Sequence, residues 1–405
     1  MDYTSCIRNE KEIDYWKNIS EFLFLVFGIS LPFSVALTFF CMGSICVLSI
    51  FRGFRFGWSQ ILKLTPLAIF CLGWLALHLI GILWAEDTYT ALIITKKAAY
   101  LASIPIFMGL ISHRILKKSL AAYVIGIFFY HLILHFMHLG WIEFDYLQVG
   151  GTPFIARIHY SPLLLLAILI LIHFHKSWTL TKFKVISILV ICSMIVSLIL
   201  IEGRSGQVLF ALLVPIWILL ETRKWKYFFG MLLILAMTAV FLFSQVDSFQ
   251  HRYTQIEHQW NQFRKGDIYS SMGQRFHHIN VSWQSFKQSP LIGHGTGSYQ
   301  SQHDRVWPNY IKGKINHNPH NQFLMTAVQF GGIGLIYMLS LFIVLLKSYS
   351  KFPHHSFRPL LILIPVMFFF LCFVDTHLYG IPSLTTFIYL TSVIFHPDWA
   401  ILEAQ

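Results

Sequence analysis

Charged side chains are scarce in this sequence. Only 12% of its 405 residues are charged and 56% are hydrophobic, whereas about 25% of an average soluble domain is charged. A soluble domain of this length needs more charge to cover its surface, and a disordered chain has fewer apolar residues. The apolar stretches are continuous and about 16 to 22 residues long, which excludes a barrel of alternating strands of about 10 residues.

Several motifs of familiar chemistry are also missing. The six cysteines form no CxxC pair, so we expect neither a zinc site nor a disulfide framework. The sequence has no Walker loop, GxGxxG or DxD cluster, which argues against ATP-driven or nucleotide-sugar chemistry. The polar N-terminal stretch carries both signs of charge and does not resemble a cleavable signal peptide. Because the metal-binding and nucleotide-binding motifs are missing, we expect no metal and no cofactor.

The apolar runs predict an all-α polytopic membrane protein that forms one domain over residues 1–405. The run 22–51 is divided at Leu31-Pro32, because proline breaks a helix interior and about 30 residues are too many for one crossing. About twelve spans are expected, at residues 17–32, 36–51, 64–84, 98–113, 119–140, 157–174, 184–201, 206–222, 227–244, 322–346, 358–374 and 381–396.

The net charge of +12 is explained by membrane topology, so we expect no nucleic-acid partner. Cytoplasmic loops collect Lys and Arg. With both termini in the cytoplasm, 18 basic residues fall in inside segments and 8 in one long outer segment. The short outside loops hold four, which are Lys96, Lys97, Arg157 and Arg204.

The long outer segment, residues 245–321 between spans 9 and 10, is the one soluble-like part of the chain. Two sets of apolar residues recur at intervals of three and four, so each predicts an amphipathic helix. Their apolar faces would pack on the bundle, rest in the headgroup layer, or wall a lipid-facing cavity. The sets are Phe249, Tyr253, Ile256, Trp260 and Phe263, and then Phe276, Ile279, Trp283 and Phe286.

Two arginines of the outer face are candidate anion ligands. Arg204 lies between two apolar runs, at the outer end of spans 7 and 8. It is either an interface arginine paired with Glu202, or an anion ligand beside Gly203 and a helix N-terminus. Arg275 opens the second amphipathic helix and is either an ordinary surface residue or a second cation for the same ligand.

Other polar residues of the outer face are candidates for substrate binding. Gly293 and Gly295 belong to a run of alternating glycines, which forms a tight turn or lets backbone approach a phosphate or sugar. The cluster Asn316–Asn321 leads into span 10, where Asn321 is a natural helix cap. His317 and His320 belong to this cluster, and a histidine at such an entry is a candidate general base near neutral pH.

The run His320-Asn321, nine residues, Gly331, two residues and Gly334 resembles the signature of the O-antigen ligase family, H[NSQ]-x9-G-x2-[GTY]. His317-Asn318 does not fit it, because Val328 falls where glycine is needed. Three further stretches are similar in order and spacing to parts of that family. They are Trp84-Ala85-Glu86-Asp87, Gly203-Arg204-Ser205-Gly206, and Gln274-Arg275 followed by Pro290-Leu291-Ile292-Gly293-His294-Gly295.

The resemblance implies glycan transfer at the periplasmic face of a Gram-negative inner membrane. The donor would be a polysaccharide on undecaprenyl pyrophosphate and the acceptor a sugar hydroxyl of lipid A–core. Arg204 and Arg275 would stabilise the leaving pyrophosphate, and His320 would be the general base. Asp87 would be a reserve base or, alternatively, part of a solvated loop. The transfer would invert the anomeric centre without metal or ATP.

Two other functions remain open from the sequence. An O-antigen polymerase would use the same donor with a second lipid-linked repeat as acceptor, and the shared motifs do not separate it cleanly from a ligase. A polysaccharide transporter or flippase would suit twelve spans. The chain lacks the internal repeats and the matched broken helices of many secondary transporters.

Overall fold

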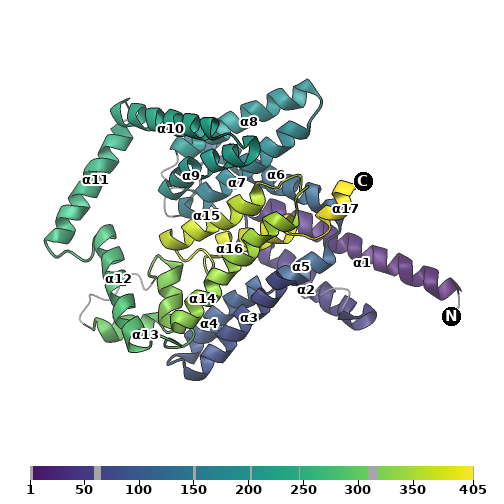
Figure 1. Ribbon diagram of the computed structural model, residues 1–405, viewed down its shortest axis with the longest axis horizontal. Coiled ribbons are helices and arrows are strands. Elements are labelled where there is room, and N and C mark those ends of the chain that lie inside the picture. Colours follow the sequence, from purple (N-terminus) through teal and green to yellow (C-terminus); the bar gives the residue numbers. More distant parts are fainter. Residues whose placement is uncertain are drawn as a thin grey trace.

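The computed structural model describes residues 3–58, 65–148, 152–200, 203–245, 247–308 and 318–404. Within these residues the regular structure is helical, apart from one isolated bridge between Gln148 and Thr152. Figure 1 shows a bundle in which α14, α15 and α16 lie centrally and both chain ends lie at the right of the view. The expected all-α class is confirmed.

The first half of the chain contains the helices α1 to α7. Its helices are α1 (Tyr3–Ser30), α2 (Val35–Phe56), α3 (Pro66–Gly81) with the short 3-10 turn η2 (Ile82–Trp84), α4 (Thr88–Leu101), α5 (Ile104–Leu110), α6 (His113–His138) and α7 (Arg157–Ser177). The second half contributes α8 (Thr181–Leu200), α9 (Arg204–Thr222), α10 (Trp225–Gln245), α11 (Asp247–Arg264), α12 (Ser271–Gln288), α13 (Tyr299–Val306), α14 (Gln322–Lys351), α15 (Leu360–Val374), α16 (Ile381–Ile394) and α17 (Trp399–Ala404).

Among the described residues, nine helices are long and apolar enough to cross a membrane. By its helix composition the chain is therefore a multi-pass membrane protein. The other three expected spans correspond to α1, α15 and α16. The last two are apolar but have only 15 and 14 residues, shorter than the roughly 20 residues of an upright crossing. The count of twelve crossings stays a prediction.

The fourth expected span, 98–113, begins ten residues too late. The apolar helix runs over Thr88–Leu110, so Lys96 and Lys97 belong to it and not to an outside loop. The ammonium group of Lys97 lies 6.0 Å from the centre of the Tyr379 ring, where an aromatic face stabilises a cation. A hydropathy window stops at two adjacent lysines, whereas the folded helix accommodates one of them by a tertiary contact.

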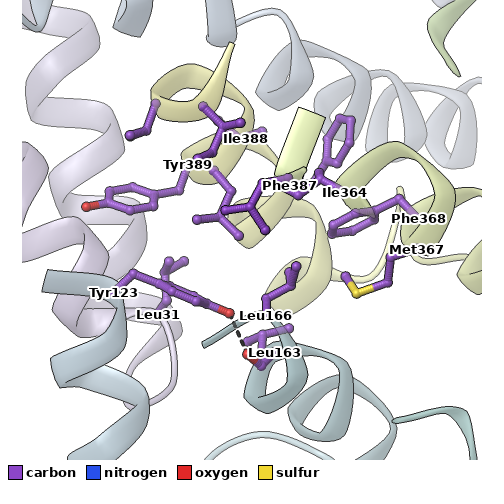
Figure 2. Close-up of a cluster of buried hydrophobic side chains, with 14 of the residues drawn as sticks. Leu31, Tyr123, Leu163, Leu166, Ile364, Met367, Phe368, Phe387, Ile388 and Tyr389 are labelled. Atoms are coloured by element: carbon purple, nitrogen blue, oxygen red, sulfur yellow. Dashed lines mark hydrogen bonds between the residues drawn. The ribbon is translucent and has the colours of Figure 1, made fainter. Parts of the chain in front are cut away.

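The centre of the bundle is built around α7, and 72% of its most apolar 18-residue stretch is buried. Figure 2 shows side chains of α6, α7, α15 and α16 meeting there. The Tyr123 hydroxyl donates a hydrogen bond of 2.8 Å to the Leu163 carbonyl, so its polar atom is satisfied within an apolar core. This core holds the ends of α7, α15 and α16 in fixed relation, and the candidate site lies at those ends.

The two amphipathic helices expected in the long segment are α11 and α12, and the structure adds the short α13. Figure 1 shows α11 running along the left of the molecule from α10 to α12. The two helices meet through stacked rings of Phe263 and Phe276, whose centres are 4.6 Å apart. α12 also packs on α14, which brings this segment to the start of α14.

Candidate active site

A large cavity lies where α9, α11, α12 and α15 converge. Its volume is about 800 Å³, within the range of ligand sites. Most of its described lining is apolar, and Arg275 is the one charged side chain among those lining residues. The walls include Ser205 and Val208 from α9, Gln259 from α11, Arg275 from α12, and Phe373 and Val374 from α15.

Arg275 is presented to this cavity by the second turn of α12. The helix starts at a sequence-encoded cap, because the Ser270 hydroxyl accepts a hydrogen bond of 3.1 Å from the Gly273 amide. Among the described residues Arg275 forms no ion pair, so its charge is not neutralised by a described carboxylate. An unpaired guanidinium on an apolar wall suits a ligand that joins an anion to a hydrocarbon chain.

Arg204 is the first residue of α9, and its side chain lies outside what the structure describes, as does Glu202. The neighbouring glycines are explained by packing. A Cβ atom on Gly203 would lie 2.5 Å from the Ser161 hydroxyl, and one on Gly206 would lie 2.6 Å from the Ser161 Cβ. These glycines therefore let the first turn of α9 press against α7. The next residue, Ser205, lines the Arg275 cavity.

His320 is held just before α14 by a carboxylate that the sequence analysis missed. Its Nδ1 lies 3.3 Å from Oδ1 of Asp375, and the two side chains are 29% and 13% exposed. Because a carboxylate accepts only, Nδ1 carries the proton of a neutral ring and Nε2 is left as the basic nitrogen. Nε2 makes no hydrogen bond to a described residue, so it is available to accept a proton from a ligand.

Asp375 is kept ionised by its surroundings. Burial raises the pKa of its carboxyl, but hydrogen bonds from His320 and the Thr376 amide, together with the charges that His320 and His377 carry when they are protonated, outweigh burial and hold that pKa well below its usual range. The Thr376 amide donates at 2.7 Å, and the Asn318 amide group donates to the same carboxylate oxygen at 3.1 Å. Asp375 is therefore a fixed negative charge that orients His320.

Two asparagines fix the backbone around His320. The Asn318 side-chain oxygen accepts a hydrogen bond of 3.0 Å from the His320 amide, and His320 adopts a left-handed φ of 48°. Asn321 caps α14, since its oxygen accepts from the Leu324 amide at 3.0 Å, while its NH2 group donates to the Phe373 carbonyl at 3.3 Å. The expected cap is confirmed, and Asn321 also ties the start of α14 to the end of α15. His317 lies outside the described residues.

A pair of histidines, of which His377 is buried, lies near Asp375. Nδ1 of His377 and Nδ1 of His159 each lie 2.8 Å from the Ser383 hydroxyl. Burial and the neighbouring His159 lower the pKa of His377 to about 3, so this ring is neutral near pH 7. His320 is the histidine in direct contact with the Asp375 carboxylate.

The His320–Asp375 pair lies next to the cavity that Arg275 lines. Val374 lines the cavity and Asp375 follows it directly. From the other side, His278 lies one turn after Arg275 on α12, and its ring centre is 6.4 Å from that of His320. The structure thus brings together two residues predicted for the site, Arg275 and His320, and adds Asp375.

The glycine-rich stretch makes close backbone contacts with the protein itself. α14 is broken at Gly331, where φ is 59°. Around this break the amides of His294 and Gly295 donate to carbonyls of α14, while amides of α14 donate to the Pro290 and Leu291 carbonyls. A Cβ atom on Gly293 would lie 2.4 Å from the backbone of α14. These contacts account for Gly293 and Gly295 without a phosphate or sugar.

Asp87 has a structural position at the start of α4. Its carboxylate accepts hydrogen bonds from the Tyr89 and Thr90 amides at 3.0 and 3.2 Å, the bonds of a helix cap. Hydrogen bonding by Thr90 lowers the pKa of Asp87, which makes it a weaker base. The neighbouring Glu86 pairs with Arg305 of α13, so the loop before α4 contacts the long segment.

Other histidines of the long segment form a buried support. Nε2 of His277 and Nε2 of His303 lie 3.0 Å apart, and the His277 ring packs edge-on against Trp307 at 5.0 Å between centres. Burial and the charge of His303 lower the pKa of His277 to about 4. His277 is therefore neutral at pH 7, and the pair connects α12 to α13.

By its helix composition the chain is a multi-pass membrane protein. The sequence model of the O-antigen ligase family matches residues 188–339, so this part of the chain is similar to that family. The family includes O-antigen ligases and polymerases. The matched region contains Arg204, Arg275 and His320, whereas Asp87 and Asp375 fall outside it. No curated protein matches the chain.

Replacing Asp375 by Asn is expected to lower kcat about 10²-fold or more and to leave the KM for the donor nearly unchanged. Asn keeps the size but removes the charge that fixes the His320 tautomer, and the same change in a serine-protease triad costs about 10⁴-fold. Steady-state transfer rates of the purified protein would measure it. Asp398→Asn is the matched control, because Asp398 lies 4.0 Å from His396 in a His–Asp pair outside the site. Equal rates for the two variants would contradict the positioning role.

Proposed function

We propose that the protein transfers O-antigen polysaccharide from undecaprenyl pyrophosphate to lipid A–core at the periplasmic face of a Gram-negative inner membrane. The observation that carries this proposal is the His320–Asp375 pair beside a mostly apolar cavity lined by Arg275, which has no carboxylate partner among the described residues. This reaction needs a general base close to a group that binds the lipid-linked pyrophosphate. His320 would supply the base and Arg275 the anion-binding group. The family match over residues 188–339 supports the same class of chemistry.

The proposed reaction is a single displacement. A hydroxyl of the acceptor sugar gives its proton to Nε2 of His320, and its oxygen forms a bond to the anomeric carbon of the donor. The bond from that carbon to the pyrophosphate oxygen breaks with inversion, and undecaprenyl pyrophosphate leaves. Arg275 and Arg204 stabilise the charge that develops on the leaving group. Pyrophosphate needs no general acid, so one base is sufficient.

The proposal also fixes an orientation in the membrane. Residues 245–321 and the ends of α9, α14 and α15 that surround the site face the periplasm. Both termini are then cytoplasmic, as the distribution of basic residues predicts. The lipid tail of the donor would occupy the apolar wall below Arg275, and its glycan would project away from the bilayer.

The second candidate is an O-antigen polymerase, since the matched family contains both activities. Deleting the gene separates them. Loss of a ligase is expected to leave lipid A–core bare while lipid-linked polysaccharide accumulates. Loss of a polymerase is expected to leave core capped by a single repeat. Electrophoresis of lipopolysaccharide, with complementation by the intact gene as control, reads out the difference, and single-repeat core would overturn the ligase proposal.

A further inference from the structure

A second cavity adjoins the one that contains Arg275. It has a volume of about 670 Å³ and lies between α11 and the start of α12. Gln259 and Ser271 line both cavities, so the two spaces are neighbours that share a wall. Its described lining consists of Thr254, Gln255, His258, Gln259 and Gln262 of α11, with Ser270 and Ser271.

The chemistry of this lining differs from that of the first cavity. Three glutamines at intervals of four and three residues occupy one face of α11, away from Trp260 and Phe263 on its apolar face. The described lining residues include hydroxyls, amides and one imidazole but no Lys, Arg, Asp or Glu. Amides and hydroxyls both donate and accept hydrogen bonds. Such a surface suits a neutral ligand rich in hydroxyl groups.

The wall shared by the two cavities places the second cavity next to the candidate active site. Ser271 lies one turn before Arg275 on α12, and the first cavity continues from Arg275 along apolar side chains of α9 and α15. A ligand with a lipid tail and an anion in the first cavity would therefore carry its next chemical group past Gln259. In a glycan linked to a lipid pyrophosphate, that group is a sugar.

We infer that the cavity between α11 and α12 binds the sugar residues of the donor that lie nearest its pyrophosphate. This inference rests on the proposed function and extends it to the glycan. The acceptor also carries sugars, but the wall shared with the Arg275 cavity favours the donor. The site would recognise neutral hydroxylated sugars through Gln255, Gln259 and Gln262.

The test compares three probes with one variant. Gln255→Leu/Gln262→Leu keeps side-chain size, removes two amides and leaves Gln259 of the shared wall intact. Binding to the detergent-solubilised full chain is measured for bare undecaprenyl pyrophosphate, undecaprenyl pyrophosphate carrying the polysaccharide, and lipid A–core. We expect about 10-fold weaker binding of the glycan-bearing donor, from the loss of two hydrogen-bonding groups. The other two probes should bind as they do to the wild type.

The control is Gln288→Leu, an exposed glutamine at the end of α12 and outside both cavities. Unchanged binding of the glycan-bearing donor, or equal weakening of the bare lipid pyrophosphate, would overturn the inference. Weakening confined to lipid A–core would assign the cavity to the acceptor and overturn it as well. If the double variant has a lower melting temperature, Gln255→Leu alone should weaken donor binding about 3-fold. If the double variant weakens only the glycan-bearing donor but the wild-type protein transfers no glycan, the proposed reaction is refuted and the sugar-binding inference stands.

Discussion

Replacing His320 by Asn is expected to abolish attachment of polysaccharide to lipid A–core while lipid-linked polysaccharide continues to be made. Removal of a general base costs about 10²–10⁴ in rate. Asn is the informative substitution because His320 has a left-handed φ of 48°, a conformation that Asn tolerates better than most residues. The variant should therefore keep the backbone before α14 and lose the basic nitrogen. Electrophoresis of lipopolysaccharide and a transfer assay with purified protein would measure the loss.

His138→Ala provides the control for this experiment. His138 is an exposed histidine at the end of α6 and has no place in the candidate site. Its loss should leave transfer within about 2-fold of the wild type, since surface substitutions away from such features have small effects. His320→Ala adds backbone strain to the chemical loss, so it should be less stable than His320→Asn. A normal set of O-chains in the His320→Asn strain would exclude His320 as the base.

Much of the bundle could be predicted from the sequence, because continuous apolar runs and amphipathic periods reflect local physics. The two helices α11 and α12 appear where spacing of three and four places them. Lys97 shows the limit of this reasoning: its contact with Tyr379 joins residues far apart in the chain, and no local window contains it. The short α15 and α16 agree with the predicted runs 358–374 and 381–396 and flank the buried loop 375–380.

The residues of the candidate site that belong to one local motif could be predicted from the sequence. Their partners from distant parts of the chain could not. His320 and Asn321 stand in one signature, whereas Asn318 and its partner Asp375 are 57 residues apart. An aspartate directly after the apolar run 358–374 was the available signal, and it gave no indication of its partner. The alternating glycines were interpreted as a tight turn or as an approach of backbone to a phosphate or sugar. Sequence did not reveal that the approaching backbone is α14, broken at Gly331.

Replacing Arg275 by Ala is expected to lower kcat/KM for the lipid-linked donor by about 10²–10³-fold, the cost of losing one group that stabilises developing negative charge. Lys should restore only part of the activity, because it cannot offer the paired N–H groups that fit two phosphate oxygens. Steady-state kinetics with varied donor and fixed acceptor would measure both variants. The effect should concern the donor, since Arg275 lines the cavity assigned to its lipid pyrophosphate.

The matched control for Arg275 is Arg305→Ala in the same long segment. Arg305 is also exposed, but its guanidinium is paired with Glu86, so its charge is already balanced and is not available to a phosphate. Removing an exposed ion pair changes stability by about 0–1 kcal/mol and should leave the donor kinetics close to those of the wild type. Equal losses in the two variants would mean that net positive charge on this segment, rather than the guanidinium at the cavity, attracts the donor. A large loss in Arg275→Ala alone would place the pyrophosphate beside α12, within one helical turn of His278, whose ring lies near that of His320.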